Sequence, residues 1–179
     1  MPLQNRGCRH QNGDRRSNTE AEAPVIEVER AVTLDHPLAD VVPFLAAFSN
    51  TETWDPGTVT CRRIGEGEPV VGSEWHNVSK FRGRRTELRY RLIHHDARHL
   101  TFVGRNKTVT STDDMRFEED GGRTRLVYRA RLDFNGLARL AQPLLKREFE
   151  RLADEVSEQL ARAVDRALRA PETEGRHPR

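Results

Sequence analysis

The sequence predicts an α+β fold in which a curved antiparallel sheet of about seven strands wraps round one long C-terminal helix. The helix is predicted from Gln142 to Arg169, where apolar residues recur at spacings of three and four. A helix of this length spans ~40 Å, more than any one strand, so its apolar face needs a sheet to lie across. The preceding segments predict that sheet, because they alternate between apolar and polar residues in short stretches separated by turns.

The first part of the domain is predicted as a strand followed by two short helices. Val25 to Leu34 alternates, with Arg30 on its apolar side, where it either forms an ion pair or places a charge in a cavity. Asp35-His36-Pro37 ends this strand, and Leu38 to Phe48 predicts a short helix. A second helical turn leads to the Trp54-Asp55-Pro56-Gly57 corner, where Pro and Gly force a turn and the indole packs against the core.

Six further strands complete the predicted sheet. They are Val59 to Gly65, Gly72 to Phe81, Arg85 to His94, His99 to Arg105, Val109 to Glu119 and Arg123 to Phe134. Asp120-Gly121-Gly122, between the last two, is a strong tight-turn signal. The final strand carries apolar residues on one face and arginines on the other, which is typical of an antiparallel sheet with one solvated face.

Length and composition indicate one domain with polar tails. The chain has 179 residues, which suffices for a single core, and we expect the domain to span residues 24–169. Residues 1–23 contain almost no large apolar side chains, and residues 170–179 follow the helix with Pro171 and Gly175. Both tails are predicted to be disordered, because they cannot bury enough surface to offset the entropy of ordering.

Charge and cysteine content narrow the class of protein. The 30 basic and 28 acidic residues leave a formal net charge of +2, and the arginines are scattered instead of forming a basic stripe, so no nucleic-acid partner is expected. Cys8 and Cys61 are too few and too isolated for a disulfide framework or a zinc site, which favours a reduced, cytoplasmic setting. No stretch predicts a signal peptide or an integral membrane segment.

The order of these elements resembles the START-like (SRPBCC) superfamily, and more narrowly its polyketide cyclase/dehydrase and lipid-transport group. The resemblance covers about Val25 to Leu168 and includes His36-Pro37-Leu38, the Trp54 to Gly57 corner, the Asp120 hairpin and the helix from Leu144. It implies a helix-grip fold with a deep apolar cavity between sheet and helix. It also implies binding of hydrophobic molecules such as lipids, sterols, quinones, polyketides or plant hormones, with catalysis in only some members and no common catalytic set.

Inward positions of such a sheet, together with the start of the helix, are the candidate ligand-binding residues. They are Trp54, Trp75, Asn77, Leu88, Tyr90, Phe102, Met115, Phe117, Tyr128, Phe134, Leu140, Leu144 and Phe149. A mostly apolar lining with a few polar groups is what a small-molecule pocket needs, since burial supplies affinity and polar groups fix orientation. The alternative for each residue is that it only fills the core. The Trp54 to Gly57 corner and the loop around Gly104 to Lys107 are predicted to form a mobile gate.

Tyr90, Tyr128 and His76 are the candidate catalytic residues. A tyrosine in the pocket can donate a proton to an enolising carbonyl, although a structural hydrogen bond is the alternative. His94, His95 and His99 lie near Asp96, but their side chains diverge on alternating strand faces, so no metal site is predicted. Asp113 and Asp114 point to opposite faces, which makes them a poor acid/base pair, with at least one expected in solvent. No phosphate loop, dinucleotide fingerprint or Ser-His-Asp set occurs, so no cofactor is expected.

The function expected from these features is binding of a hydrophobic small molecule, lipid-like, polyketide-like or quinone-like, in the cavity between sheet and helix. One alternative is a polyketide cyclase or dehydratase acting in the same cavity. Another is a protein-interaction module. Its contact surface would be the arginines of the outer sheet face, Arg89, Arg91, Arg125, Arg129 and Arg131.

Overall fold

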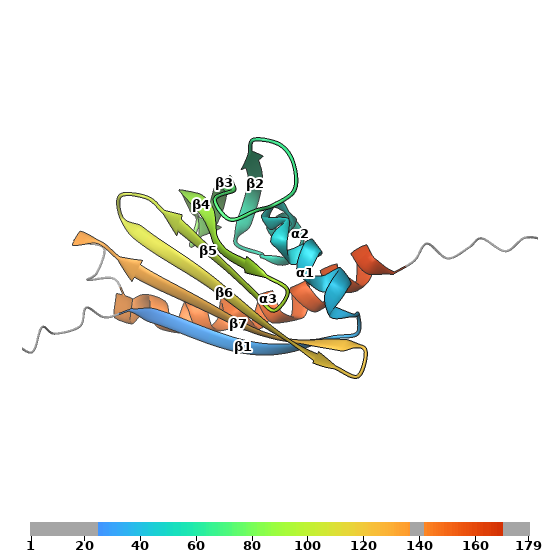
Figure 1. Ribbon diagram of the computed structural model, residues 1–179. Coiled ribbons are helices and arrows are strands. Elements are labelled where there is room, and N and C mark those ends of the chain that lie inside the picture. Colours follow the sequence, from blue (N-terminus) through green and yellow to red (C-terminus); the bar gives the residue numbers. More distant parts are fainter. Residues whose placement is uncertain (1–24, 137–141, 170–179) are drawn as a thin grey trace, which may run out of the picture.

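A computed structural model describes residues 25–136 and 142–169 of the chain, which form one curved sheet and its covering helices (Figure 1). The sheet has the strand order β1-β7-β6-β5-β4-β3-β2, with every pair antiparallel. The strands are β1 Ile26–Leu34, β2 Thr58–Ile64, β3 Glu74–Phe81, β4 Arg84–Asp96, β5 His99–Arg105, β6 Val109–Asp120 and β7 Arg123–Phe134. The helices are α1 Leu38–Ala46, the 3₁₀ turn η1 Phe48–Asn50, α2 Thr51–Trp54 and α3 Gln142–Leu168.

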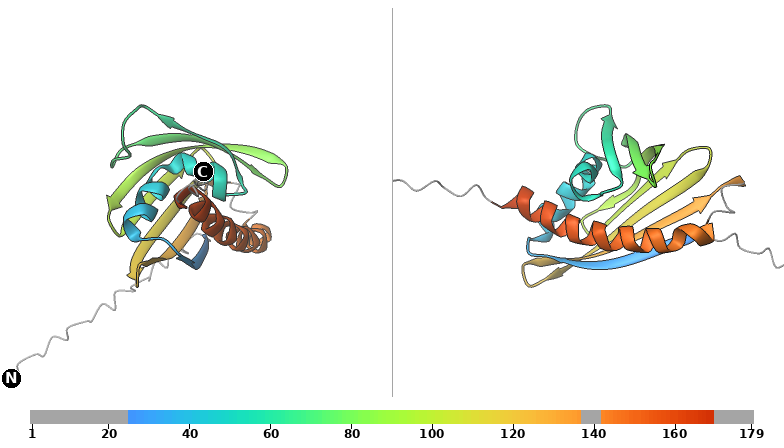
Figure 2. Two further views of the ribbon diagram at one scale, coloured as in Figure 1. Left: turned by 90° about the vertical axis from the view of Figure 1, so that its right-hand side faces the viewer. Right: turned by 180° about the vertical axis from the view of Figure 1, so that it is seen from behind.

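The helices lie on the concave side of the sheet (Figure 2). α3 runs along this side next to β1, while α1 and α2 occupy the end that faces the C-terminal half of α3. This arrangement is the helix-grip, START-like fold that the sequence predicts, and the predicted order of strand, two short helices, six strands and long helix is confirmed.

α3 is buried along its C-terminal half and less so along its N-terminal half. Val156, Leu160 and Val164 are buried, whereas Leu145 and Phe149 remain partly exposed. All five belong to the one apolar ridge that predicts the helix. The ridge therefore serves two environments: a packed core towards the C-terminus and a more open space towards the N-terminus.

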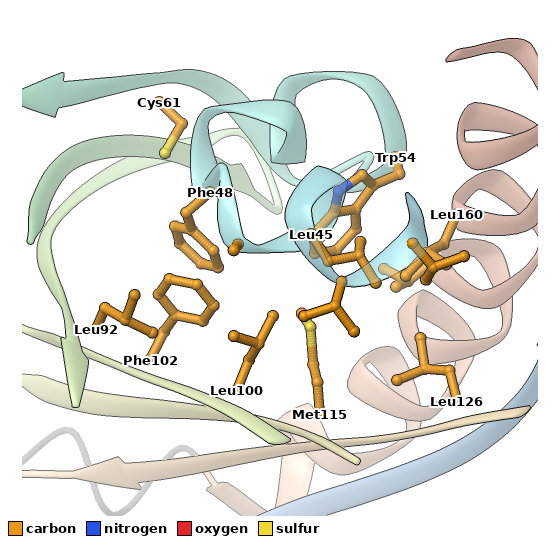
Figure 3. Close-up of a cluster of buried hydrophobic side chains, with 14 of the residues drawn as sticks. Leu45, Phe48, Trp54, Cys61, Leu92, Leu100, Phe102, Met115, Leu126 and Leu160 are labelled. Carbon is orange, nitrogen blue, oxygen red and sulfur yellow. The ribbon is translucent and has the colours of Figure 1, made fainter. Parts of the chain in front are cut away.

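The packed end of the sheet is filled by side chains from the segment between β1 and β2 (Figure 3). The Phe48 ring stacks on Phe102 with centroids 4.1 Å apart, and its centroid lies 5.9 Å from Trp75 in an edge-on arrangement. Leu45 and Trp54 of the same segment are also buried in this core cluster. Well-packed aromatic groups of this kind leave no room for a ligand, so the open space lies at the other end of the concave face.

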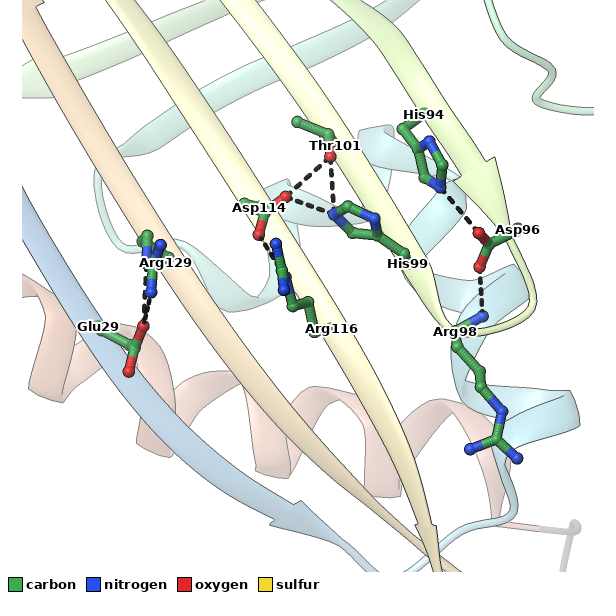
Figure 4. A network of polar contacts seen from close by, with 9 residues as sticks. All are labelled: Glu29, His94, Asp96, Arg98, His99, Thr101, Asp114, Arg116 and Arg129. Atoms are coloured by element: carbon green, nitrogen blue, oxygen red, sulfur yellow. Dashed lines mark hydrogen bonds and ion pairs between the residues drawn. The ribbon is translucent and has the colours of Figure 1, made fainter.

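The outer face of the sheet is a lattice of charged pairs (Figure 4). Asp114 accepts hydrogen bonds from Thr101 and Arg116, and the His99 Nε2 lies 2.5 Å from the same carboxylate. Arg129 forms an ion pair of 2.6 Å with Glu29 on the adjacent strand. Arg89 and Arg125 are likewise paired, with Glu74 and Glu118. Arg89, Arg125 and Arg129 are thus engaged in ion pairs within the sheet.

The element boundaries match the predicted ones to within about two residues. The first helix ends at Ala46, slightly before the predicted Phe48, because Phe48 starts the 3₁₀ turn. The two predicted disordered tails lie outside the described residues. In the described ranges no helix combines the length and apolar composition needed to cross a membrane.

Candidate functional site

A cavity of about 230 Å³ separates the concave face of the sheet from the N-terminal half of α3. Its walls come mainly from β1, β4, β6, β7 and α3. Its apolar lining consists of Val28, Phe81, Leu88, Val109, Ala130, Leu132, Phe134, Leu145, Phe149, Leu152, Ala153 and Val156. Because a cavity of ~150 Å³ holds a benzene ring, this one has room for a somewhat larger ring system.

Asp113 is the centre of a polar cluster inside this apolar cavity. Its Oδ1 accepts a hydrogen bond of 2.5 Å from the Tyr128 hydroxyl, and its Oδ2 lies 3.3 Å from the Ser111 hydroxyl. Tyr90 lines the same cavity and interacts electrostatically with Asp113 and Ser111. Asp113 and Tyr90 are only 6% and 8% exposed. The cluster is therefore a largely water-excluded set of donors and acceptors that faces the cavity.

The register of three neighbouring strands brings Tyr90 to this cluster. Tyr90 on β4 is paired with Gly104 on β5, and Gly104 is paired with Ser111 on β6. A Cβ atom at Gly104 would lie 2.6 Å from the Tyr90 ring. The missing side chain therefore lets the ring pass over β5, so that its hydroxyl reaches β6.

Strand alternation on β6 places two consecutive aspartates in opposite environments. Ser111 and Asp113 face the cavity, and Met115, two residues further on, faces the packed core. Asp114 lies on the outer face, in the charged lattice. The inward face of this one strand thus changes from polar to apolar where the cavity gives way to the core.

The mouth of the cavity lies between the β3–β4 hairpin and α3. There the Phe81 ring stacks on the Phe149 ring of α3, with centroids 4.7 Å apart and planes inclined by 9°. A second hollow of about 380 Å³ adjoins the cavity, shares Gly57 and Lys80 with it, and is edged by exposed residues such as Arg82. The contact between hairpin and helix is therefore an aromatic pair at the edge of solvent.

Arg30 lies on the cavity wall and is held by α3. Its Nε donates to Asp154 at 2.6 Å, and its Nη2 donates to the Glu150 carbonyl oxygen at 3.1 Å. The sequence left two alternatives for Arg30, an ion pair or a charge in a cavity. The structure shows both, since Arg30 lines the cavity and is ion-paired with Asp154. The pair anchors the N-terminal half of α3 to β1 beside the cavity.

A family profile described as polyketide cyclase / dehydrase and lipid transport matches residues 25–165. The chain belongs to this family. A comparison with curated protein sequences found no significant match. The match covers every strand and all but the last residues of α3, so it includes the cavity and its polar cluster.

Solved structures share the fold of this family member at low sequence identity. The ZhuI aromatase/cyclase from Streptomyces sp. R1128 aligns with a TM-score of 0.68 and 19% identity, over 82% of this chain and 98% of that one. A START superfamily protein from Mycobacterium smegmatis aligns with a TM-score of 0.58 and 15% identity, over 79% and 96% of the two chains. At these identities the likeness establishes the helix-grip fold.

The structure divides the predicted ligand-binding residues of this family member into two groups. Leu88, Tyr90, Tyr128, Phe134 and Phe149 line the cavity. The others with described side chains do not line it and are buried beside it: Trp54, Trp75, Asn77, Phe102, Met115 and Phe117. Leu140 lies outside the described residues, and Leu144 belongs to the α3 backbone without a described side chain.

The predicted set contains more residues than line the cavity, because Phe48 and its neighbours fill one end of the concave face. Trp75 and Phe102 pack against Phe48, which leaves them no free surface. Asn77 is occupied by hydrogen bonds with Thr58 and Ser79. Inward orientation is therefore shared by core and cavity residues, and the position along the strand decides between them.

His76 does not reach the cavity, so the structure removes it from the catalytic candidates. Its side chain is exposed on the outer face, where Nε2 lies 3.1 Å from a Glu87 carboxylate oxygen. The physical reason is strand parity, because its neighbours Trp75 and Asn77 occupy the inward positions. His94 pairs with Asp96 and His99 with Asp114, and the described part of the chain contains no cluster that could hold a metal ion.

The two segments of the predicted gate are both hydrogen-bonded in the structure. Trp54 is 2% exposed in the core. Asp55 accepts hydrogen bonds from the Gly57 amide and the Thr58 hydroxyl, which fixes the corner. In the second gate segment, the Asn106 carboxamide oxygen accepts from the backbone amides of residues 108 and 109. The Phe81 and Phe149 pair, rather than these segments, stands at the mouth.

Burial perturbs the titration of the polar cluster. It raises the pKa of Asp113 to about 6, although the hydrogen bond from Tyr128 acts in the opposite direction. Burial, followed by the charge of Asp113, raises the pKa of Tyr90 and of Tyr128 well above the ordinary tyrosine value. Burial also raises the pKa of Asp55. Ionisation of Asp113 is therefore less favourable than in water, and both phenols stay protonated as hydrogen-bond donors at neutral pH.

Sequence reasoning missed Asp113 as a functional residue. The available signal was an acidic side chain at an inward position of an alternating strand, two residues from Met115 and four from Phe117 on the same face. Asp113 and Asp114 do point to opposite faces, as predicted. The sequence does not show that Asp113 pairs with Tyr128, because Tyr128 lies on a different strand, β7, fifteen residues further along the chain.

We predict that Asp113→Asn raises the free energy of unfolding at pH 7.5 by about 1–3 kcal/mol. The folded state holds the Asp113 proton up to a pH of about 6, whereas the unfolded chain releases it near 3.8. The resulting penalty is therefore present above pH 6 and absent below the unfolded pKa. Urea unfolding at pH 7.5 and at pH 3.5 measures both limits, and equal effects at the two values would contradict the prediction.

Asp114→Asn is the matched control on the same strand. Burial raises the pKa of Asp114, but hydrogen bonds from His99 and Thr101 outweigh it, so the net shift is downward. Asp114 consequently contributes stability above its unfolded pKa and loses it as the pH falls. Its substitution should lower stability at pH 7.5, the opposite sign to Asp113→Asn.

Gly104→Ala should destabilise the protein by about 1–3 kcal/mol, because the new methyl group overlaps the Tyr90 ring. A double-mutant cycle with Tyr90→Ala, measured by urea unfolding, isolates this overlap. In the Tyr90→Ala background the Gly104 substitution should have a much smaller effect. An unchanged effect in that background would show that the ring is not what requires glycine.

Proposed function

We propose that this protein binds an apolar small molecule, polyketide-like, quinone-like or lipid-like, in the cavity between the sheet and α3. The proposal rests on one observation: a mainly apolar cavity contains a buried polar cluster, formed by Asp113, Tyr128, Tyr90 and Ser111. Apolar walls supply affinity through burial, and a single polar cluster fixes which end of the ligand points inward. The proposal includes the cytoplasmic setting favoured by the cysteine content.

The Phe81 and Phe149 pair gives a route by which such a ligand enters. The pair lies at the mouth, where the hairpin between β3 and β4 meets α3. Arg82 and Gly83 at the hairpin tip have positive φ angles of 48° and 80°. Separation of the two rings would expose the cavity while the packed core around Phe48 stays intact. Closure would then exclude water from the polar cluster.

Substitution of Ala153 by Trp tests the proposal, because Ala153 lines the cavity from α3. The uncharged fluorescent probe phenylnaphthylamine should bind the unaltered protein at one saturable site. Ala153→Trp should weaken that binding at least about tenfold, ~1.4 kcal/mol, by filling the space. Ala167→Trp is the matched control, since Ala167 is an exposed alanine on the same helix.

Circular dichroism of both variants confirms that each is folded before the titrations are compared. Saturable binding that is equally strong in the two variants would place the probe elsewhere. Absence of saturable binding to the unaltered protein, together with no molecule released from it by solvent extraction, would overturn the proposal.

A second candidate function is a polyketide cyclase or dehydratase acting in the same cavity. The observation that favours it is the Asp113–Tyr128 contact of 2.5 Å inside the water-poor cavity. There the Asp113 carboxylate would remove a proton next to a carbonyl group while a tyrosine hydroxyl donates to the carbonyl oxygen as it becomes an enolate. A base whose pKa lies near 6 is suited to such a transfer at neutral pH. The family membership and the aromatase/cyclase neighbours support this candidate.

Tyr128→Phe separates the two functions. If the protein is a cyclase or dehydratase, this variant should lose turnover of a poly-β-ketone substrate by about 10²-fold or more while retaining binding, because only the proton donor is removed. Product analysis by liquid chromatography measures turnover, and probe titration measures binding. Turnover that is undiminished would exclude Tyr128 as the donor, and turnover absent from the unaltered protein would leave binding as the function.

A further inference from the structure

The described contacts do not pair the two positively charged residues of the cavity lining with its two carboxyl groups. These four residues are Arg30, Lys80, Asp55 and Asp113. The guanidinium of Arg30 is engaged by Asp154 and by the backbone carbonyls of Glu29 and Glu150. Lys80 is exposed and also edges the hollow at the mouth. Among the described contacts, neither cation pairs with Asp55 or Asp113, whose hydrogen-bond donors are neutral.

Asp113 is stabilised only by neutral groups among its described contacts. Tyr128 and Ser111 donate hydroxyl hydrogen bonds to Asp113, Tyr90 lies beside it, and none of these three groups carries a positive charge. Asp55 adds a second carboxyl group whose charge acts unfavourably on Asp113. A buried carboxylate normally requires a paired cation or very complete hydrogen bonding. The cavity therefore has a deficit of positive charge at Asp113.

Aromatic rings surround the same region. Tyr90 and Tyr128 both line the cavity and both contact Asp113 through their hydroxyl groups, and Phe134 and Phe149 contribute further rings to the lining. The faces of aromatic rings attract ammonium groups, and this attraction grows when water is excluded. A carboxylate set among aromatic rings inside a cavity suits a cation better than an anion.

We infer that the preferred ligand of the cavity is an apolar molecule that bears a cationic amine, with the ammonium group against Asp113 and its ring system against the apolar walls and α3. This inference rests on the proposed binding function and specifies the chemical class of ligand. The ammonium group supplies the missing positive charge and donates hydrogen bonds to a carboxylate that already accepts from Tyr128. An anionic ligand of the same shape meets the repulsion of Asp113 and Asp55.

Three probes of matching shape test the inference: naphthylmethylamine, naphthylmethanol and naphthoate. Isothermal titration at pH 7.5, where the amine is cationic, should show that the amine binds at least about tenfold more tightly than the alcohol. Naphthoate should bind most weakly. The alcohol serves as the reference, because it fills the same space without a charge.

Two variants assign the preference to a residue. Asp113→Asn keeps the hydrogen-bonding shape but removes the charge, so it should reduce the preference for the amine over the alcohol to about threefold or less while the alcohol still binds. Asp114→Asn removes a charge from the outer face of the same strand and should leave the preference unchanged. Loss of the preference in the Asp114 variant would show that it depends on the overall charge and would overturn the inference.

The outcomes separate this inference from the proposed function. If the alcohol binds in the cavity but the amine binds no more tightly, the inferred amine preference is wrong and the binding function stands. If Ala153→Trp abolishes binding of the amine and Asp113→Asn abolishes its preference, both are supported. If none of the three probes nor phenylnaphthylamine binds, both are overturned.

Discussion

The structure depends on how α3 packs against the concave face of the sheet. Its C-terminal half is held by Val156, Leu160 and Val164, which join the core formed with α1, α2 and the sheet. No equivalent layer of helices lies under its N-terminal half in the described structure, where Arg30 on β1 and Phe81 on β3 contact the helix. One amphipathic helix therefore packs into the core with its C-terminal half and covers the cavity with its N-terminal half.

The polar cluster is costly to the fold, and this cost supports its choice as the candidate site. A carboxyl group buried among tyrosines and apolar walls disfavours its own ionisation, which lowers stability as the pH rises through about 6. An apolar residue at position 113 would continue the face begun by Met115 and Phe117. Groups that lower the stability of the folded state and lie in a cavity are typical of binding and catalytic sites.

Most of the fold was predictable from the sequence, because it depends on periodicity. Alternation identifies each strand and its inward face, and the ridge from Leu145 to Leu168 identifies the helix. Alternation does not reveal where along a strand the core ends. Trp75 and Tyr90 both point inward and both pack against Phe48, yet only Tyr90 also lines the cavity.

The candidate site was less predictable, because its decisive contacts join residues whose pairing depends on strand register. The route from Tyr90 over Gly104 to Ser111 requires three strands to be aligned residue by residue. His76 shows the same dependence in the opposite sense, since a neighbour of two inward residues necessarily points outward. A glycine inside an alternating strand, as at Gly104, is the one local signal that a large side chain crosses there.

Stability and the proposed ligand preference would both depend on the charge of Asp113. Burial disfavours the negative form of Asp113, so the folded protein binds a proton more tightly there than the unfolded chain does. A bound ammonium group would oppose this effect by favouring the carboxylate, and proton release and ligand binding would then be linked. A neutral ligand offers no such compensation. Asp113 weakens the fold at neutral pH, and under the proposed amine preference it is also the residue that a cationic ligand would pair with.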